Sequence, residues 1–326
     1  MRARLFGRIL LAAAVLTFSS TDSPAKETVL GVALSPAHLP NPSDKDFENF
    51  FDEAAQLGSH VIWIVEWESL PELGAFESVR RATRVKGLAF HIFLSPIALT
   101  GGRKTPAIPE GVRGRSFGDQ TVRNGYRDQA LKLAGLEPDF LGLGTEVNAL
   151  AQNPAEFEPF ASMVRETCVA VKQKFPSIKV MTSFQWDLAH ATGQTAPLTR
   201  FGECFDYYSF TTYPFFPPSG PVYDPSTIAA DYYSGIRKLF PTQRVGFSEV
   251  GWTSAEPWNE DSQAAFFRRL PELMRPVKAD FVTLSLMHDI PFFSGDLAPL
   301  NSVGVRHRDG SPKKAWDVVL SLPPSF

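Results

Sequence analysis

Short apolar runs alternate along this chain with longer segments in which apolar residues recur every three or four positions. The short runs have the length and composition of buried strands, and the longer segments have the period of amphipathic helices. The predicted strands are residues 29–34, 61–65, 88–94, 140–144, 179–184, 207–212, 245–248 and 281–286. The predicted helices are residues 44–57, 73–85, 120–134, 154–175, 227–239, 261–274 and 313–320, with a weaker helical piece at 198–201.

Local signals define several helix ends. Ser43 is a good N-cap for the first helix, and Gly58 is a good stop. Pro154 suits a first helical turn. Pro271 lies inside the helix predicted at 261–274, so we expect it to kink or end that helix early.

Strands that alternate with helices predict an α/β fold with a parallel sheet, and eight such strands predict a single closed (β/α)8 TIM barrel. About 300 residues is an ordinary size for that fold as one domain. The alternative is an open doubly wound sheet, but no glycine-rich phosphate turn follows the first predicted strand.

The first 25 residues have the pattern of a signal peptide rather than of the fold. Three arginines precede the apolar stretch 9–18, which is too short to span a bilayer. Small residues at 23–25 predict cleavage after Ala25. We therefore expect residues 1–25 to be removed and 26–326 to form an exported barrel, periplasmic or secreted, without a stable membrane anchor. The alternative is an anchor that is retained.

Composition narrows the function only in part. A net charge of −3 gives no reason to expect binding to nucleic acid or to an anionic membrane. The 27 Phe, 7 Tyr and 6 Trp suit both a core and the stacking of rings on sugars. Export would permit a bridge between the two cysteines, Cys168 and Cys204, but the sequence does not decide it, and we favour free thiols. We expect a monomer.

Two predicted strands end in a glutamate. The run 139–148 leads to Glu146, and the run 244–252 leads to Glu249. By the period of two, Phe140, Gly142, Gly144 and Glu146 share a narrow face that something should approach closely. Because barrel active sites lie at the C-terminal strand ends, we interpret Glu146 and Glu249 as the two catalytic carboxyls of a glycosidase. The residues predicted to bind substrate at the same rim are Asn148, Gln185, Tyr213, Trp252 and His288.

These positions make the chain resemble the clan A retaining glycoside hydrolases. In that clan an acid/base glutamate ends strand four, a nucleophilic glutamate ends strand seven, and a strand-six tyrosine lies near the nucleophile. Glu146, Glu249 and Tyr213 match those places. The run 249–252, Glu-Val-Gly-Trp, and the segment 304–316 are distantly similar to the family 53 galactanases. The resemblance implies a retaining O-glycosidase that hydrolyses a β-linked oligo- or polysaccharide.

The chain also departs from the clan pattern. Thr145 stands where the clan has an Asn that holds the sugar 2-hydroxyl, and Asn148 is the candidate substitute. Met287-His288-Asp289 replaces the strand-eight tryptophan. Thr145 favours the main alternative, a non-catalytic barrel that binds glycan and has kept its site carboxylates.

Each candidate residue has a plainer interpretation. A glutamate at a strand end is commonly a solvated or ion-paired carboxylate, Tyr213 belongs to a proline-rich loop that packs on the barrel, and Trp252 caps the core. The long loop 95–118 carries Arg103 and three other basic residues; we expect a solvated loop rather than a lid.

Other barrel chemistries find less support. An isomerase or aldolase would need an inner lysine, and Lys179 lies at the wrong end of its strand. The six histidines are scattered, so we predict no metal and no cofactor.

Overall fold

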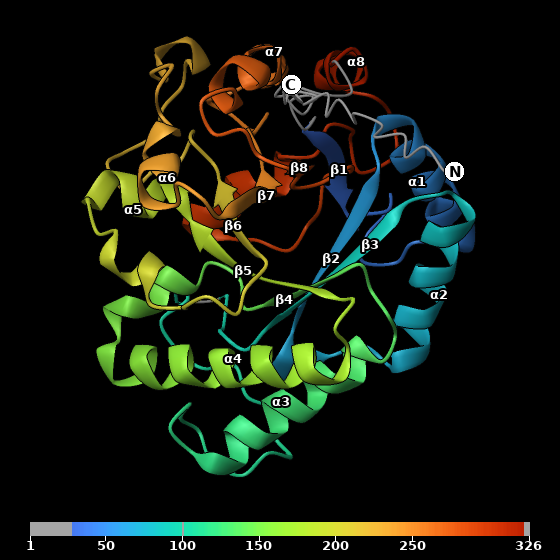
Figure 1. Ribbon diagram of the computed structural model, residues 1–326. Coiled ribbons are helices and arrows are strands. Elements are labelled where there is room, and N and C mark those ends of the chain that lie inside the picture. The colour runs from blue at the N-terminus through green and yellow to red at the C-terminus, as the bar shows by residue number, and fades with distance from the viewer. Residues whose placement is uncertain (1–27, 100, 323–326) are drawn as a thin grey trace, which may run out of the picture.

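The computed structural model describes residues 28–99 and 101–322, so the predicted signal peptide lies outside the described residues. Eight parallel strands close into a barrel in chain order, and the helices surround it (Figure 1). The strands are β1 (Val29–Ala33), β2 (His60–Glu66), β3 (Ala89–Ser95), β4 (Phe140–Leu143), β5 (Lys179–Gln185), β6 (Tyr207–Thr212), β7 (Arg244–Val250) and β8 (Phe281–Leu284). The predicted (β/α)8 barrel is confirmed, and each strand boundary lies within two residues of the predicted one.

The α-helices of the described chain are α1 (Asp44–Leu57), α2 (Leu73–Val85), α3 (Gln120–Ala134), α4 (Pro154–Lys174), α5 (Trp186–Thr192), α6 (Ser234–Leu239), α7 (Glu260–Met274) and α8 (Lys314–Leu320). Ser43 caps α1 as expected, because its side chain accepts a hydrogen bond from the backbone of Asp46 while the Asp46 carboxylate accepts one from the backbone of Ser43.

Two helix predictions were wrong in detail. The sequence did not reveal α5, which continues directly from β5 without a capping side chain. Helix α6 begins at Ser234, several residues later than predicted. Helix α7 has nearly the predicted bounds and continues through Pro271 to Met274, so Pro271 does not end it early; a proline this close to the helix end removes only one hydrogen bond of the last turns.

Glycines inside the barrel make room for aromatic rings. A Cβ added at Gly31, Gly142 or Gly246 would lie 2.3, 2.1 or 2.2 Å from the ring of His60, Phe93 or Phe281, respectively. The rings of Phe93, Tyr207 and Phe281 belong to a cluster that fills the barrel interior. The narrow face at Gly142 is therefore approached by the Phe93 ring rather than by a ligand, which corrects the interpretation made from the sequence.

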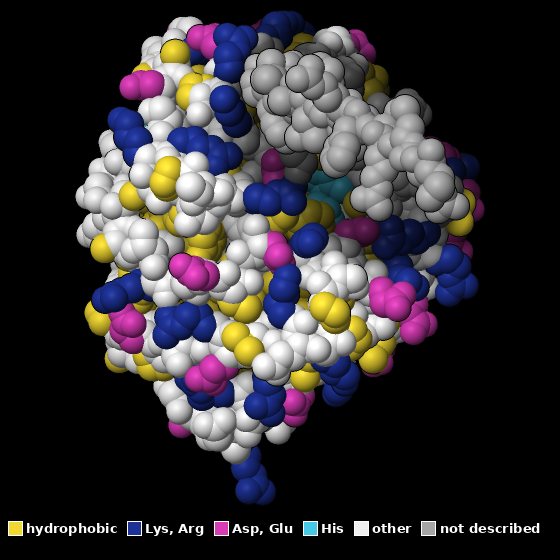
Figure 2. All heavy atoms as spheres, viewed as in Figure 1, with side chains coloured by type: hydrophobic (Ala, Val, Ile, Leu, Met, Phe, Trp, Pro, Cys, Tyr) yellow, Lys and Arg dark blue, Asp and Glu magenta, His cyan; other side chains and the backbone are white. Residues whose placement is uncertain are grey.

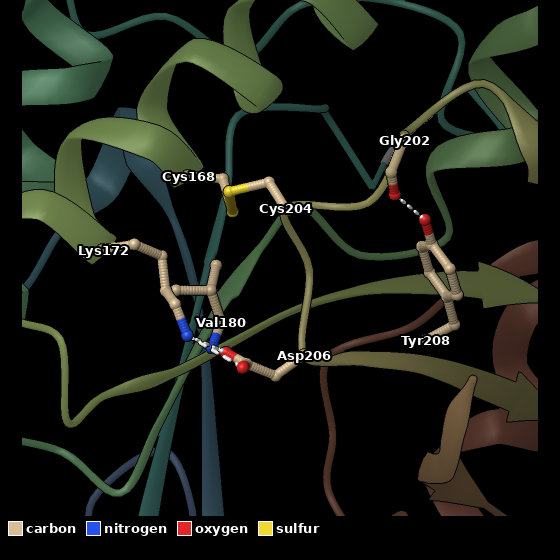
Figure 3. Close-up of a disulfide and its surroundings, with 7 residues drawn as sticks. All are labelled: Cys168, Lys172, Val180, Gly202, Cys204, Asp206 and Tyr208. Carbon is tan, nitrogen blue, oxygen red and sulfur yellow. Dashed lines mark hydrogen bonds and ion pairs between the residues drawn. A yellow bond between two sulfur atoms is a disulfide. The ribbon is translucent and has the colours of Figure 1, made fainter. Parts of the chain in front are cut away.

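The expectation of free thiols was also wrong. Cys168 on α4 and Cys204 before β6 form a disulfide with an S–S distance of 2.07 Å (Figure 3). Beside it, the Asp206 carboxylate accepts hydrogen bonds from Lys172 Nζ at 2.7 Å and from the backbone of Val180 at 2.8 Å. The bridge and these bonds hold α4 against the starts of β5 and β6.

Basic and acidic side chains are interspersed over the described surface visible in Figure 2, in keeping with the small net charge. Within residues 28–99 and 101–322, no helix is both long and apolar enough to cross a membrane.

Candidate active site

A cavity of about 680 Å³ lies at the C-terminal ends of the barrel strands. The polar side chains at its floor come from different parts of the barrel: Glu146 follows β4, Gln185 ends β5, Asp187 lies in the first turn of α5, Tyr213 follows β6, and Glu249 belongs to β7. The closed barrel therefore brings both predicted catalytic carboxyls to one cavity.

Glu146 is held at both carboxylate oxygens. The chain leaves β4 through Gly144 and Glu146, which have φ values of 89° and 53°, so strand alternation ends here and the carboxyl turns into the cavity. Only 9% of Glu146 is exposed. Arg103 Nε donates to Oε2 at 2.6 Å, and Thr211 Oγ1 donates to Oε1 at 2.8 Å. These two hydrogen bonds fix the orientation of the carboxyl group.

Arg103 belongs to the loop that we expected to be solvated. Ile97 and Pro106 form an antiparallel bridge, which makes a small hairpin of this part of the loop. At its tip Gly102 and Arg103 both have positive φ, and the Arg103 side chain is buried against Glu146. The sequence prediction was wrong for this residue. The Gly101-Gly102 pair was the available signal, because such a pair marks a tight turn.

Glu249 is the second carboxyl of the cavity. The Tyr213 hydroxyl donates a hydrogen bond to Glu249 Oε2. Burial, and next the negative charge of Glu146, raise the pKa of Glu249 to about 7, against the opposing effects of the Tyr213 hydrogen bond and the Arg103 charge. Burial, followed by the charge of Glu249, raises the pKa of Tyr213 well above its usual value, so this hydroxyl stays a donor.

Asp187 fixes the backbone position of Tyr213 by a hydrogen bond. Its Oδ2 accepts the backbone N–H of Tyr213 at 2.5 Å, and its Oδ1 accepts the hydroxyls of Thr212 at 2.9 Å and Tyr232 at 2.7 Å. Burial raises the pKa of Asp187. No sequence signal indicated this role, because the partners of Asp187 come from segments 25 to 45 residues away in the chain.

The cavity holds more acidic than basic side chains. Three carboxyls (Glu146, Asp187 and Glu249) face one guanidinium, that of Arg103. Arg103 donates a hydrogen bond to Glu146, whereas burial favours the protonated form of Glu249.

The other predicted binding residues lie in different surroundings. Gln185 lines the cavity. The Asn148 amide is instead occupied by the backbone of Gln185, accepting from its N–H at 2.7 Å and donating to its carbonyl at 3.1 Å. Asn148 lines a smaller neighbouring hollow. The hydroxyl of Thr145 is buried without a hydrogen-bond partner among the described residues.

Trp252 and His288 are core residues. The Trp252 ring is fully buried and stacks on Phe266, with a centroid distance of 5.1 Å. His288 Nδ1 lies 2.9 Å from the carbonyl of Ser35, and burial lowers the pKa of His288 to about 4. Neither side chain belongs to the described lining of the cavity.

Known structures share this architecture at low sequence identity. An exo-β-1,4-mannosidase from Opitutaceae bacterium strain TAV5 superposes with a TM-score of 0.70 at 16% identity, over 91% of this chain and 59% of that one. A GH5_18 protein from Streptomyces cattleya in complex with GlcNAc gives 0.72 at 18% identity, over 91% and 79%. A structure of fungal β-1,4-galactanases gives 0.64 at 15% identity, over 91% and 100%.

The chain has the fold of these glycoside hydrolases. The expected likeness to clan A is confirmed at the level of fold. The chain spans only about three fifths of the length of the mannosidase. No family model matches the chain, and no curated protein matches it.

Proposed function

We propose that the protein is a retaining glycosidase that hydrolyses a β-linked glycoside, with Glu249 as nucleophile and Glu146 as acid/base. The observation that carries this proposal is the placement of both carboxyls in one cavity from the ends of β4 and β7, with the Tyr213 hydroxyl on Glu249. The solved glycoside hydrolases with the same fold support the reaction class.

The proposed reaction consists of two displacement steps at the anomeric carbon. The Glu249 carboxylate attacks the anomeric carbon, the bond to the leaving oxygen breaks, and Glu146 gives that oxygen its proton. Glu146 then takes a proton from a water molecule, whose oxygen attacks the anomeric carbon and releases Glu249. Tyr213 steadies the nucleophile through its hydrogen bond. Arg103 has to leave Oε2 of Glu146 before that oxygen can carry the transferred proton.

The setting of the reaction is part of the proposal. We propose a monomer, exported after loss of residues 1–25, that acts on an oligo- or polysaccharide. The Cys168–Cys204 disulfide supports export, because such bridges persist in oxidising compartments.

A non-catalytic glycan-binding barrel is the second candidate. The observation in its favour is that neither Thr145 nor Asn148 presents a free polar group to the cavity, so the clan's contact to the 2-hydroxyl has no evident replacement there. Gln185 is the amide that remains available.

Hydrolysis of aryl β-glucosides, β-galactosides and β-mannosides separates the candidates. For an active substrate, proton NMR should show the β-anomer first. Glu249→Ala should abolish turnover. Glu146→Ala should keep activity on substrates with good leaving groups, which need little protonation, and lose it on poor ones. An α-anomer formed first would overturn the double displacement, and binding of sugars without any turnover would favour the second candidate.

A further inference from the structure

The two loops that flank the mouth of the cavity are apolar. The segment after β6 contributes Phe216, Pro217 and Pro218, and the segment after β8 contributes Phe292 and Phe293, among others. Phe292 is 56% exposed and Phe216 is 38% exposed. Exposed aromatic side chains gathered around one opening are typical of a binding surface rather than of a core.

The polar groups are confined to the floor. Among the described lining residues, those with polar or charged side chains are Ser35, Arg103, Glu146, Gln185, Asp187, Tyr213, Glu249 and Ser285. Beyond Tyr213 and Ser285, the lining residues of the two flanking loops carry no charged, amide or hydroxyl side chain. A sugar unit held between these loops would bury hydroxyls without side-chain partners, which costs free energy for each one.

The floor and the mouth therefore suit different parts of one ligand. The floor has carboxylates, an amide and hydroxyls at hydrogen-bonding positions, as a sugar ring needs. The mouth has aromatic rings, prolines and aliphatic side chains, as hydrocarbon needs. Both belong to the same cavity, so a ligand with one sugar on the floor would place the group attached to that sugar between the apolar loops.

We propose that the leaving-group side of this site binds an apolar aglycone, so that the substrate is an amphiphilic β-glycoside with an alkyl or aryl group on its anomeric oxygen. This inference rests on the proposed function for the hydrolytic step, and it replaces a second sugar by hydrocarbon in the leaving-group position. In the first displacement the anomeric carbon–oxygen bond breaks, the alcohol leaves with the proton from Glu146, and water later frees the sugar.

A series of methyl, butyl and octyl β-glycosides of glucose, galactose and mannose, kept below their critical micelle concentrations, tests the inference. Each methylene placed between the loops should raise kcat/KM about threefold until the apolar surface is covered. The disaccharide with the same sugar at its non-reducing end should be a poorer substrate than the octyl glycoside.

Phe216→Ser and Phe292→Ser should each raise KM for the octyl glycoside severalfold more than KM for the methyl glycoside. Tyr223→Ser is the matched control, because Tyr223 is 53% exposed on the same loop as Phe216 but does not line the cavity. It should leave both substrates unchanged.

The outcomes separate this inference from the proposed function. If glycosides are hydrolysed but kcat/KM does not depend on chain length, or the disaccharide is preferred, the inference is overturned and the glycosidase stands. If nothing is hydrolysed, calorimetry of glycoside binding to the Glu249→Gln protein decides. Tighter binding of octyl than of methyl glycosides, with this difference lost in Phe292→Ser, supports the apolar mouth without the reaction. Equal binding of the two overturns it.

Discussion

Glu146 and Glu249 lie in one cavity under opposite electrostatic influences. Arg103 and Thr211 hold Glu146 through its two oxygens, whereas burial and the charge of Glu146 act against ionisation of Glu249. Paired carboxyls with divergent environments are how enzymes keep one proton between two acids. Ionising Glu249 beside Glu146 lowers the stability of the folded protein. This effect can be measured by unfolding, without any substrate.

Replacing Glu249 should make the protein more stable in alkaline solution. The pKa of Glu249 is raised from 4.5 to about 7 in the folded state, so its contribution to stability is present at low pH and lost as pH rises through about 7. Glu249→Gln stays neutral and should gain up to about 3 kcal/mol over the unchanged protein at pH 8, and nothing at pH 4. Thermal unfolding from pH 4 to 8 measures this; a difference in melting temperature that does not grow with pH would contradict it.

Arg103 should set the pH range of activity. The charge of Arg103 lowers the pKa of Glu249, so Arg103→Gln should raise that pKa and shift the pH profile of kcat/KM to higher pH. Arg103→Lys keeps the charge and should shift the profile less. Arg113→Gln is the matched control, because Arg113 lies exposed on the same loop outside the cavity. An unchanged profile in Arg103→Gln would show that the arginine does not influence the carboxyl pair.

At the scale of elements, β1, β4 and β7 each carry a glycine where an aromatic ring of another residue packs inside the barrel. Gly142 on β4 leaves room for the Phe93 ring of β3 inside the barrel. Gly31 and Gly246 leave room for the rings of His60 and Phe281 in the same way. After Gly142 the chain abandons the strand conformation at Gly144, and this turn directs Glu146 into the cavity. Packing inside the barrel and the position of a site carboxyl are therefore set within the five residues 142–146, which run from β4 into the turn after it.

Gly142→Ala should destabilise the barrel by about 1–3 kcal/mol, because the new methyl group would overlap the Phe93 ring in a close-packed interior. Gly74→Ala is the matched control: it lies in α2 with open space around the added methyl group, and it should stabilise the protein by up to about 1 kcal/mol. Urea unfolding of both variants provides the comparison. Equal effects of the two substitutions would mean that the interior gives way around the extra atom.

At the scale of the whole molecule, the disulfide links parts that the barrel already brings together. It closes a separation of 36 residues between α4 and the segment before β6. If the disulfide acts by reducing the conformational entropy of the unfolded chain, a loop of this length raises the free energy of the unfolded state by about 4 kcal/mol. The bridge therefore acts on the unfolded chain more than on the shape of the cavity.

Replacing both cysteines by serine should lower the free energy of unfolding by about 2–4 kcal/mol and leave kcat/KM unchanged, since the bridge is not part of the cavity lining. Calorimetry with and without a reducing agent checks the size of the effect. The double variant should no longer respond to the reductant. A loss of activity in a variant that is still folded would show that the bridge positions the site after all.

Export predicts a defined N-terminus. If cleavage follows Ala25, the protein recovered from the periplasm or the medium should begin at Lys26. Intact mass spectrometry tests this directly. Recovery of the chain from a membrane fraction with Met1 still present would refute the cleavage and favour a retained anchor.

The sequence by itself determined the barrel and the two strand ends that carry Glu146 and Glu249. It did so because a period of two or of 3.6 is a local property, and eight repetitions of strand and helix leave few ways to close the sheet. The sequence could not determine which rim residues reach the cavity. Trp252 and His288 turned into the core, and Arg103 came in from a distant loop, because side-chain reach depends on the path of each loop. Only the tertiary structure brought Cys168 to Cys204 and buried Glu249 beside Glu146, since both effects arise between segments far apart in the chain.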